Sequence, residues 1–302
     1  MDHKQFLHCC NLINTSLVNQ VMDRTFNSVG SNIFFEFGEK KEYVFPNGKK
    51  SAQKEWSIWL SWTSWRITHH NRYITGSDEN PEISIQSFLD KLLGKRFQSL
   101  LFVSQFLDIE LNFEDGYKVN TFFNYSVENQ WLIFLPNDSE IVIDCSTKES
   151  IKSLQSLSKQ ININDRFTKV NLSILQEKVD EISYNEGKIS KLILSNDFLV
   201  DLGTAAWRLA KNDEYYLGRL DYYFGLKEER EKDLRNIISD LIGKSLKNVS
   251  IDSSGMDVRL EFEDGCVFEI FTHSKVEPWK IYSKNEIILH AKIENTENQT
   301  EI

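Results

Sequence analysis

The sequence predicts an α+β protein made of two tandem copies of one module, with an added N-terminal helix. Each module is expected to be a mainly antiparallel sheet packed with one central helix. The first observation is a repeat: residues 93–122 align without a gap with residues 242–271, at an offset of 242 − 93 = 149, and ten of the thirty positions are identical. The second is period-two alternation of apolar residues, and the third is apolar residues at helical spacing that stop at glycine.

The repeat extends beyond this aligned block. Upstream, Trp65-Arg66-Ile67 matches Trp207-Arg208-Leu209 at an offset of 207 − 65 = 142. Downstream, Trp131-Leu132-Ile133 matches Trp279-Lys280-Ile281. The landmarks keep one order in both halves, so we interpret the chain as a duplication.

The elements of each module follow from local patterns. Asp108 to Phe113 alternates apolar and polar residues, Glu-Asp-Gly forms a turn, and Tyr117 to Phe123 returns, which predicts a hairpin. The tryptophan segment and the Glu-Ile-Val-Ile segment after it are expected to extend the same meander. The remaining predicted elements are an N-terminal helix over 4–22, strands over 55–67 and 198–209, and central helices over 85–93 and 233–242.

These elements give three segments. Residues 1–147 form the first module with its N-terminal helix, and residues 148–170 form a linker or connecting helix. Residues 171–302 form the second module and end in a short polar tail. Helix packed on one face of an antiparallel sheet is the architecture that this order favours.

Charge and composition narrow the class of partner. The chain carries 35 basic and 45 acidic residues, a formal net charge of −10, without a basic run. Direct binding to nucleic acid is therefore not expected, whereas a protein partner with a basic surface is. No apolar run is long enough for a membrane helix, the first residues lack a secretory pattern, and the four cysteines form no framework, so we expect a cytoplasmic protein. The oligomeric state is left open.

No catalytic, cofactor or metal motif stands out. Leu-Gly-Lys at 93–95 and the matching Ile-Gly-Lys at 242–244 each follow a predicted helix, the reverse of the order in a phosphate-binding loop. The Glu-Asp-Gly turns at 114–116 and 263–265 offer too few oxygen ligands for calcium. The histidine pair at 69–70 does not recur in the second copy. We therefore expect a protein that is not an enzyme and has no cofactor or metal.

A group of tryptophans supplies candidate partner-binding residues. On a strand over 55–67, Trp62 would face the core and Trp59 the opposite side. The repeat aligns Trp59 with Asp201, so this position is expected to be solvent-accessible. Trp59, with Trp56 and Asp201, is therefore a candidate binding surface, because exposed aromatics are enriched at binding hot spots. The alternative is that the N-terminal helix or the sister module covers Trp59.

The repeated Trp-Arg pair gives a second candidate. Trp65-Arg66 and Trp207-Arg208 could line a ligand pocket between the two modules. The alternative, which ordinary sheet packing favours, is a buried tryptophan beside an outward arginine in each copy.

The module also resembles a known group of proteins. A Trp-Arg strand, a helix leading to Leu-Gly-Lys, an Asp-x-x-Leu-x-Phe-x-Asp-Gly hairpin and a tryptophan strand are similar to small bacterial proteins of polymorphic-toxin immunity and defence loci. The resemblance covers about 55–143 and 198–289. It implies a non-enzymatic immunity-type inhibitor or a subunit of a defence complex. A small-ligand-binding regulatory protein and an enzyme with an unrecognised site are the rival hypotheses.

Overall fold

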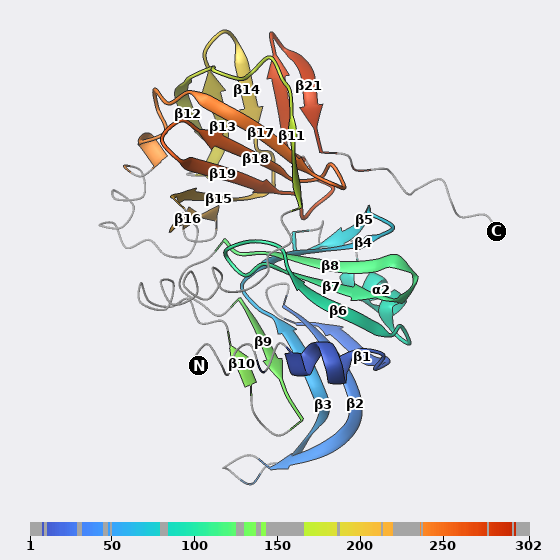
Figure 1. Ribbon diagram of the computed structural model, residues 1–302. Coiled ribbons are helices and arrows are strands. Elements are labelled where there is room, and N and C mark those ends of the chain that lie inside the picture. The colour runs from blue at the N-terminus through green and yellow to red at the C-terminus, as the bar shows by residue number, and fades with distance from the viewer. Residues whose placement is uncertain are drawn as a thin grey trace, which may run out of the picture.

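The computed structural model shows a chain built almost wholly from strands (Figure 1). It describes residues 8, 11–28, 32–44, 48, 50–78, 84–124, 130–136, 140–142, 166–185, 188–212, 214–219, 236, 238–276, 278–291 and 293. Strands make up 56% of the structure and form four antiparallel sheets. All pairings within these sheets are antiparallel, as expected for strands joined by hairpins and short crossovers.

The first half of the chain forms two sheets that face each other. The outer sheet has the order β1-β2-β3-β9-β10 and the inner sheet the order β5-β4-β8-β7-β6. Apolar side chains from both sheets form one buried core, which makes this half a β-sandwich. Its strands are β1 Met22–Asn27, β2 Ile33–Val44, β3 Lys50–Leu60, β4 Ser64–His69, β5 Arg72–Gly76, β6 Phe97–Phe102, β7 Ile109–Phe113, β8 Tyr117–Phe122, β9 Trp131–Phe134 and β10 Glu140–Val142.

The second half repeats this architecture. Its outer sheet is β12-β13-β14-β20-β21 and its inner sheet is β16-β15-β19-β18-β17, with β11 added at the edge beside β17. Each strand from β12 to β21 therefore has a counterpart from β1 to β10 in the same order. The strands are β11 Phe167–Val170, β12 Val179–Asn185, β13 Lys188–Leu194, β14 Phe198–Asp201, β15 Ala206–Lys211, β16 Glu214–Gly218, β17 Leu246–Asp252, β18 Val258–Phe262, β19 Cys266–Phe271, β20 Lys280–Ser283 and β21 Glu286–His290.

The expected α+β class is wrong, because a second sheet takes the place of the central helix. The helix expected over 85–93 is α2, Ile85–Leu89, which continues as the 3₁₀ turn η3, Asp90–Leu92. At eight residues it buries only Leu89 and Leu92. The core is instead closed by β1–β3 in one half and β12–β14 in the other. Of these strands, only the end of β3 and β14 fall within predicted strands, those over 55–67 and 198–209.

The N-terminal helix, the second central helix and the linker are described only in part. The N-terminal helix appears in the described residues as the π-helix η1, Ile13–Leu17, which buries both terminal side chains. Of the second central helix, expected over 233–242, residues 233–235 and 237 lie outside the described residues, while Asn236, Ile238 and Ser239 are helical and 240–242 form a turn. Ile238 and Leu241 of this segment are buried. The expected tail, 294–302, and residues 148–165 of the expected linker also lie outside the described residues. Phe167–Val170, which the linker was expected to include, form strand β11 and pair with β17.

The predicted single strand over 55–67 is also wrong. The chain turns a corner at Ser61–Thr63, where Trp62 adopts a positive φ of 50°, so β3 and β4 belong to opposite sheets. The same break separates β14 from β15 in the second copy. The tryptophan strand β9 likewise leaves the expected meander and pairs with β3 across the sandwich. The sequence pattern does not show the corner, because the period-two alternation of apolar residues from Trp56 to Trp62 runs through it without a break.

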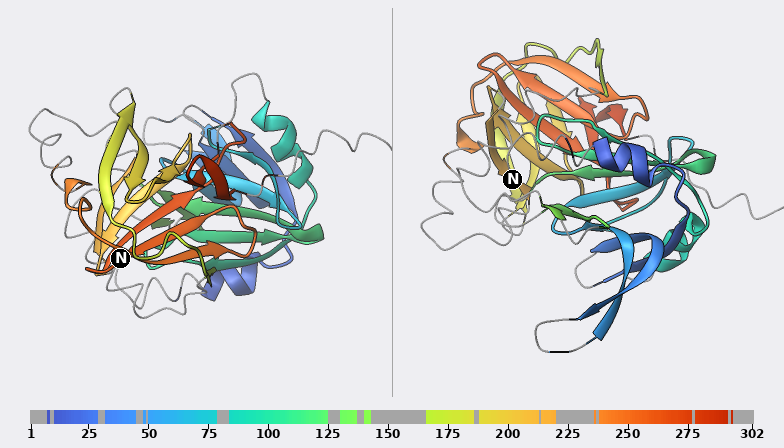
Figure 2. Two further views of the ribbon diagram at one scale, coloured as in Figure 1. Left: turned by 90° about the horizontal axis from the view of Figure 1, so that it is seen from above. Right: turned by 60° about the horizontal axis from the view of Figure 1, so that its bottom comes forward.

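The hairpin expected from the repeat is confirmed. In β7 and in β18 the burial alternates strictly, with every second residue buried. The two inner sheets then pack against each other, as Figures 1 and 2 show for β4 and β8 beside β15 and β19. Phe122 of β8 stacks on Phe271 of β19, with ring centroids 5.0 Å apart and planes 10° apart. The outer sheets therefore lie on the far sides of their sandwiches from this contact.

Candidate functional site

The outer sheet of the first sandwich carries a row of aromatic side chains on the face away from its core. Phe26, Phe34 and Trp59, here called the aromatic row, are directly opposite one another on β1, β2 and β3. Their rings stack, with centroid distances of 4.4 Å between the phenylalanines and 4.9 Å from Phe34 to Trp59. Leu132 on β9 continues the row. Cross-strand aromatic pairs stabilise a sheet and hold the rings in place.

The aromatic row is only partly covered. All three rings are half-buried, and the indole Nε1 of Trp59 is shielded from solvent without a hydrogen-bond partner. The sequence leaves two elements that could cover Trp59, the N-terminal helix and the sister module. In the described residues η1 packs on β6, where Asn14 bonds to Leu100, and the second sandwich packs on the other sheet. Neither of these elements lies over the row.

The equivalent position in the second sandwich is polar, as the repeat predicts. Asp201 lies between Lys191 and Lys280 on neighbouring strands, and Ser183 lies beyond Lys191. The Nζ of Lys191 is 4.0 Å from the carboxylate of Asp201, which also accepts a 3.0 Å bond from the N–H of Gly203. Trp59 and Asp201 thus occupy matching sites with opposite chemistry.

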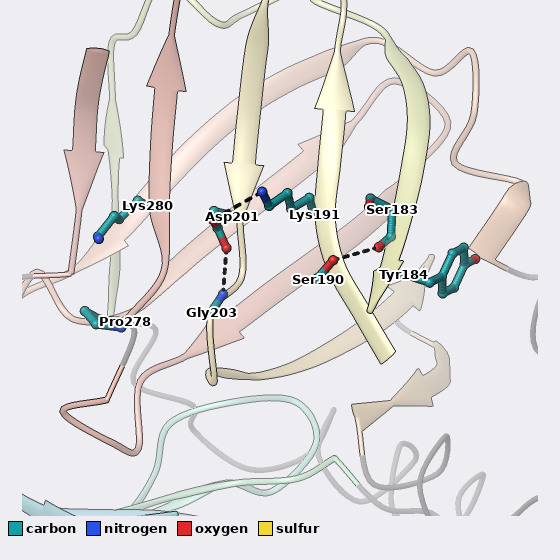
Figure 3. Close-up of a pocket in the computed structure, with 8 residues that line it drawn as sticks. All are labelled: Ser183, Tyr184, Ser190, Lys191, Asp201, Gly203, Pro278 and Lys280. Carbon is teal, nitrogen blue, oxygen red and sulfur yellow. Dashed lines mark hydrogen bonds and ion pairs between the residues drawn. The ribbon is translucent and has the colours of Figure 1, made fainter. Parts of the chain in front are cut away.

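This polar row borders an open hollow of about 480 Å³ (Figure 3). Tyr184, 40% exposed, stands at one margin, and Pro278 stands at the other. In the described part of the chain the side chain of Lys280 makes no ion pair or hydrogen bond. The hollow offers hydroxyl, ammonium and carboxylate groups to a polar molecule, but its two lysines are solvated and impose no single geometry.

The other tryptophans named from the sequence lie elsewhere. Trp56 is 3% exposed and points into the core between the sheets, so it does not share the surface of Trp59. Trp65 and Trp207 are equally buried, each in its own sandwich. Trp62 was expected in the core but is 41% exposed at the corner between β3 and β4.

Arg66 and Arg208 meet the opposite sandwich in a reciprocal arrangement. Arg66 of the first sandwich forms an ion pair with Asp257 of the second, and its Nη2 donates a 2.9 Å hydrogen bond to Oδ2 of Asp257. Arg208 of the second reaches back to Asp108 of the first, at 2.7 Å. The repeat aligns Asp108 with Asp257, so the two pairs are related by the duplication.

The surrounding contacts repeat as well. Arg66 donates to the carbonyl of Thr272 and Arg208 to that of Phe123, which are matching positions. The guanidinium of Arg66 lies 4.5 Å from the ring centroid of Phe271, and that of Arg208 lies 4.3 Å from that of Phe122. These are favourable cation–π distances. Both arginines are 1% exposed, so this region is filled by the protein's own side chains.

Two glycines let the sandwiches approach. A Cβ at Gly76 would lie 2.1 Å from the carbonyl oxygen of His273, and a Cβ at Gly218 would lie 2.3 Å from that of Asn124. Both distances are far inside van der Waals contact, so only glycine fits. Gly76 and Gly218 match at the offset of the Trp-Arg segments, 218 − 76 = 142, but the sequence does not show what they approach.

Beside this contact, His273 joins three segments. Its Nδ1 is 2.8 Å from the hydroxyl of Ser77, and its Nε2 is 2.9 Å from a guanidinium nitrogen of Arg219. Since Arg219 can only donate, Nε2 accepts and Nδ1 carries the proton. Burial, and next the charge of Arg219, lower the pKa of His273 to about 3. A neutral ring with both nitrogens occupied is a structural link between the sandwiches.

The two repeated Gly-Lys segments contact the two repeated Glu-Asp-Gly turns. The lysines of Leu-Gly-Lys at 93–95 and of Ile-Gly-Lys at 242–244 pair with the aspartate of the Glu-Asp-Gly turn in their own sandwich, Lys95 with Asp115 and Lys244 with Asp264. Partial burial raises the pKa of Asp264, but hydrogen bonds from Lys211 and Lys244 hold it well below its usual range. These motifs therefore stabilise a hairpin. Within the described residues no three histidine, cysteine or acidic side chains gather as a metal site.

Comparisons with protein-family models, with curated proteins and with solved structures found no match for this chain. In the residues that the structure describes, no helix is long and apolar enough to span a membrane.

Proposed function

We propose that the chain is a non-enzymatic protein-binding protein whose partner docks on the outer sheet of the first sandwich. The aromatic row carries this proposal. Three stacked rings are half-exposed on a rigid sheet, and the duplicate sandwich has the charged Lys191 and Asp201 at the matching place. The comparison within one chain shows that the fold does not require aromatic residues here.

The physical case rests on preorganisation. Trp and other aromatic residues dominate binding energy at protein interfaces, because they bury a large area with few rotatable bonds. Stacking against Phe26 and Phe34 holds Trp59 in one place before a partner arrives, which reduces the entropy lost on binding. A net charge of −10 additionally steers a basic partner toward the chain. The resemblance to immunity-type proteins points to the same class, an inhibitor or a subunit of a defence complex.

A ligand pocket at the Trp-Arg pairs has less support. Trp65, Arg66, Trp207 and Arg208 are at most 2% exposed and are committed to the two cores and the reciprocal ion pairs. A ligand would have to displace buried charges, which is expensive. We therefore place the binding surface on the outer sheet and not between the sandwiches.

The test compares protein capture by matched variants. Tagged full-length protein is incubated with lysate of its native host, and retained proteins are identified by mass spectrometry. Trp59→Asp introduces the residue that the second copy carries, so the sheet should tolerate it. Tyr216→Asp removes a 42% exposed aromatic from the second sandwich and serves as the control.

The expected result is a stoichiometric protein retained by the wild type and by Tyr216→Asp but lost with Trp59→Asp, at an unchanged melting temperature. Equal retention by all three chains would contradict the proposed surface. Recovery of the bare chain without a stoichiometric protein would contradict the proposed function.

A further inference from the structure

Strands β2 and β3 continue beyond the sheet to which they belong. Within the outer sheet, β1 pairs with β2 only as far as Phe37, and β9 pairs with β3 only from Ser57 onward. Past these positions β2 and β3 still pair with each other, from Lys40 opposite Lys54 to Val44 opposite Lys50. Figure 1 shows them running away from the rest of the first sandwich as a two-stranded ribbon. Residues 38–44 and 50–55 are called the ribbon arm.

The second sandwich shows that this arm is an addition. Trp56 aligns with Phe198, and the residues opposite them are Phe37 and Leu194. Between Leu194 and Phe198 the chain needs only the three residues 195–197 to turn. Between Phe37 and Trp56 it uses eighteen, residues 38–55. The fold closes without the arm, so the arm is not needed to build the sandwich.

A glycine sets the direction of the arm. Gly38 has a φ of +80°, and the pairing register shifts between Phe37 and Lys40, which is a β-bulge. A Cβ at Gly38 would lie 3.1 Å from Cβ of Glu55, so both conformation and space favour glycine. A bulge bends its strand and increases the local twist. Lys54 bonds to Asp23 and to the carbonyl of Gly38, at 3.1 and 2.9 Å, and fastens the base of the arm.

The charge of this segment is opposite to that of the rest of the chain. The ribbon arm holds four lysines and three glutamates, a net charge of 4 − 3 = +1. The other residues hold 35 − 4 = 31 basic and 45 − 3 = 42 acidic side chains, or −11. The net charge of the whole chain favours a basic partner, but the local charge of the arm favours an acidic one.

The arm also has two free edges in the described structure. On the outer sides of residues 38–44 and 50–55 no described strand pairs with the backbone, so its N–H and C=O groups can accept another strand. A two-stranded ribbon is only marginally stable in water, and a third strand would stabilise it. A second copy of this chain is a poor third strand, because lysines on both strands would repel their own copies.

We propose that the ribbon arm binds an extended acidic segment of the partner protein by β-strand addition. Backbone hydrogen bonds would supply the affinity and the lysines would select glutamate or aspartate side chains. This rests on the proposed function, since β2 and β3 also carry Phe34 and Trp59 and one partner can cover both. Nucleic acid would satisfy the lysines but has no backbone groups spaced to continue a sheet.

The test uses fluorescence anisotropy with a synthetic probe and full-length protein. The probe is a fluorescein-labelled octapeptide of alternating glutamate and valine. Its controls are the same peptide with alternate backbone nitrogens methylated, which cannot extend a sheet, and an oligothymidine of equal charge. K40E/K41E reverses the charge of two side chains of the ribbon arm. K247E/K280E makes the same change in net charge on the second sandwich, where Lys247 is exposed and the side chain of Lys280 forms no ion pair or hydrogen bond in the described structure. A further variant replaces 38–55 with Ser-Asn-Asp, the turn at 195–197.

We expect the unmethylated peptide to bind the wild type and K247E/K280E alike. K40E/K41E should weaken binding by about tenfold or more, and excision of the arm should abolish it. Equal binding of the methylated peptide, tighter binding of oligothymidine, or undiminished binding after excision would overturn the proposal. Trp59→Asp should leave binding of the peptide unchanged, so failure of this test is distinguishable from failure of the aromatic row to capture a partner.

Discussion

Removing one arginine of the reciprocal pairs should cost more than removing the other. Arg208→Met leaves Asp108 buried without its cation, because in the described structure Asp108 pairs only with Arg208. Arg66→Met leaves Asp257 with Arg166, whose Nη2 is 2.8 Å away. It also removes the 3.3 Å ion pair of Arg66 with Asp252, but Asp252 still accepts hydrogen bonds from the hydroxyl of Ser254 and from two backbone N–H groups. An uncompensated buried charge costs about 3–5 kcal/mol. The loss of one charged hydrogen-bonding partner among several costs about 1.5–3 kcal/mol.

Glu269, the acidic partner of Arg208 on the second sandwich, does not add to the cost of Arg208→Met. Glu269 bonds to Arg208 at 2.5 Å and to Arg259 at 2.7 Å. Burial raises the pKa of Glu269, but these two arginines lower it to about 2. After Arg208→Met, Glu269 keeps Arg259 and stays charged, so the excess cost falls on Asp108. We therefore expect Arg208→Met to be the more destabilising variant by about 1–2 kcal/mol.

Urea unfolding at pH 7, followed by tryptophan fluorescence and by far-ultraviolet circular dichroism, measures this difference. Coincident transitions would justify a two-state free energy of unfolding for a chain with two sandwiches. Arg24→Met is the control, because its ion pair with Glu36 is 3.4 Å long and Arg24 is 58% exposed, and its cost should stay below about 1 kcal/mol. A cost for Arg208→Met equal to or smaller than that for Arg66→Met would refute the reasoning.

Three further outcomes are expected. The unfolded chain binds a proton at residue 273 below about pH 6.5 and the folded chain only below about pH 3, so stability should fall by up to about 1.4 kcal/mol per pH unit as the pH drops through this window. H273N, which installs the residue found at the equivalent Asn124, should flatten this slope in urea titrations between pH 4.5 and 7, and an unchanged slope would contradict the assignment. Gly76→Ala should cost about 1–3 kcal/mol through its clash. Gly94→Ala, with open space but a φ of +78°, should cost about 1 kcal/mol, and an equal or greater cost than Gly76→Ala would argue against the close approach. Trp59→Asp should change the free energy of unfolding by less than Trp56→Ala, a buried aromatic whose loss costs about 3–5 kcal/mol, and the reverse order in urea unfolding would place Trp59 in the core.

Local patterns were enough for part of this protein. The hairpin β7–β8 and its counterpart β18–β19 follow from alternation and a Glu-Asp-Gly turn, because neighbouring strands pair across only a few residues. The chemical contrast between Trp59 and Asp201 followed from the repeat, which supplies an internal comparison without any relative. Lys95 and Asp115 both recur at one offset, 244 − 95 = 264 − 115 = 149, but the sequence did not show that they pair.

The fold class depended on contacts far apart in the chain. The apolar segment at Trp131 could pair equally well with β8 or with β3, and only the closure of a second sheet decides for β3. That closure removes the need for a central helix, so α2 remains short. The same holds for Arg66 and Arg208, whose partners lie 191 and 100 residues away, as 257 − 66 and 208 − 108.

The sequence by itself therefore determined the duplication, the turn chemistry and the positions where the two copies differ. The tertiary structure alone decided which sheet each strand joins, which arginine meets which aspartate, and that β2 and β3 extend beyond their sheet. The physical reason is that hydrogen bonding within a turn is local, whereas strand pairing and the burial of charge depend on which distant segments exclude water together.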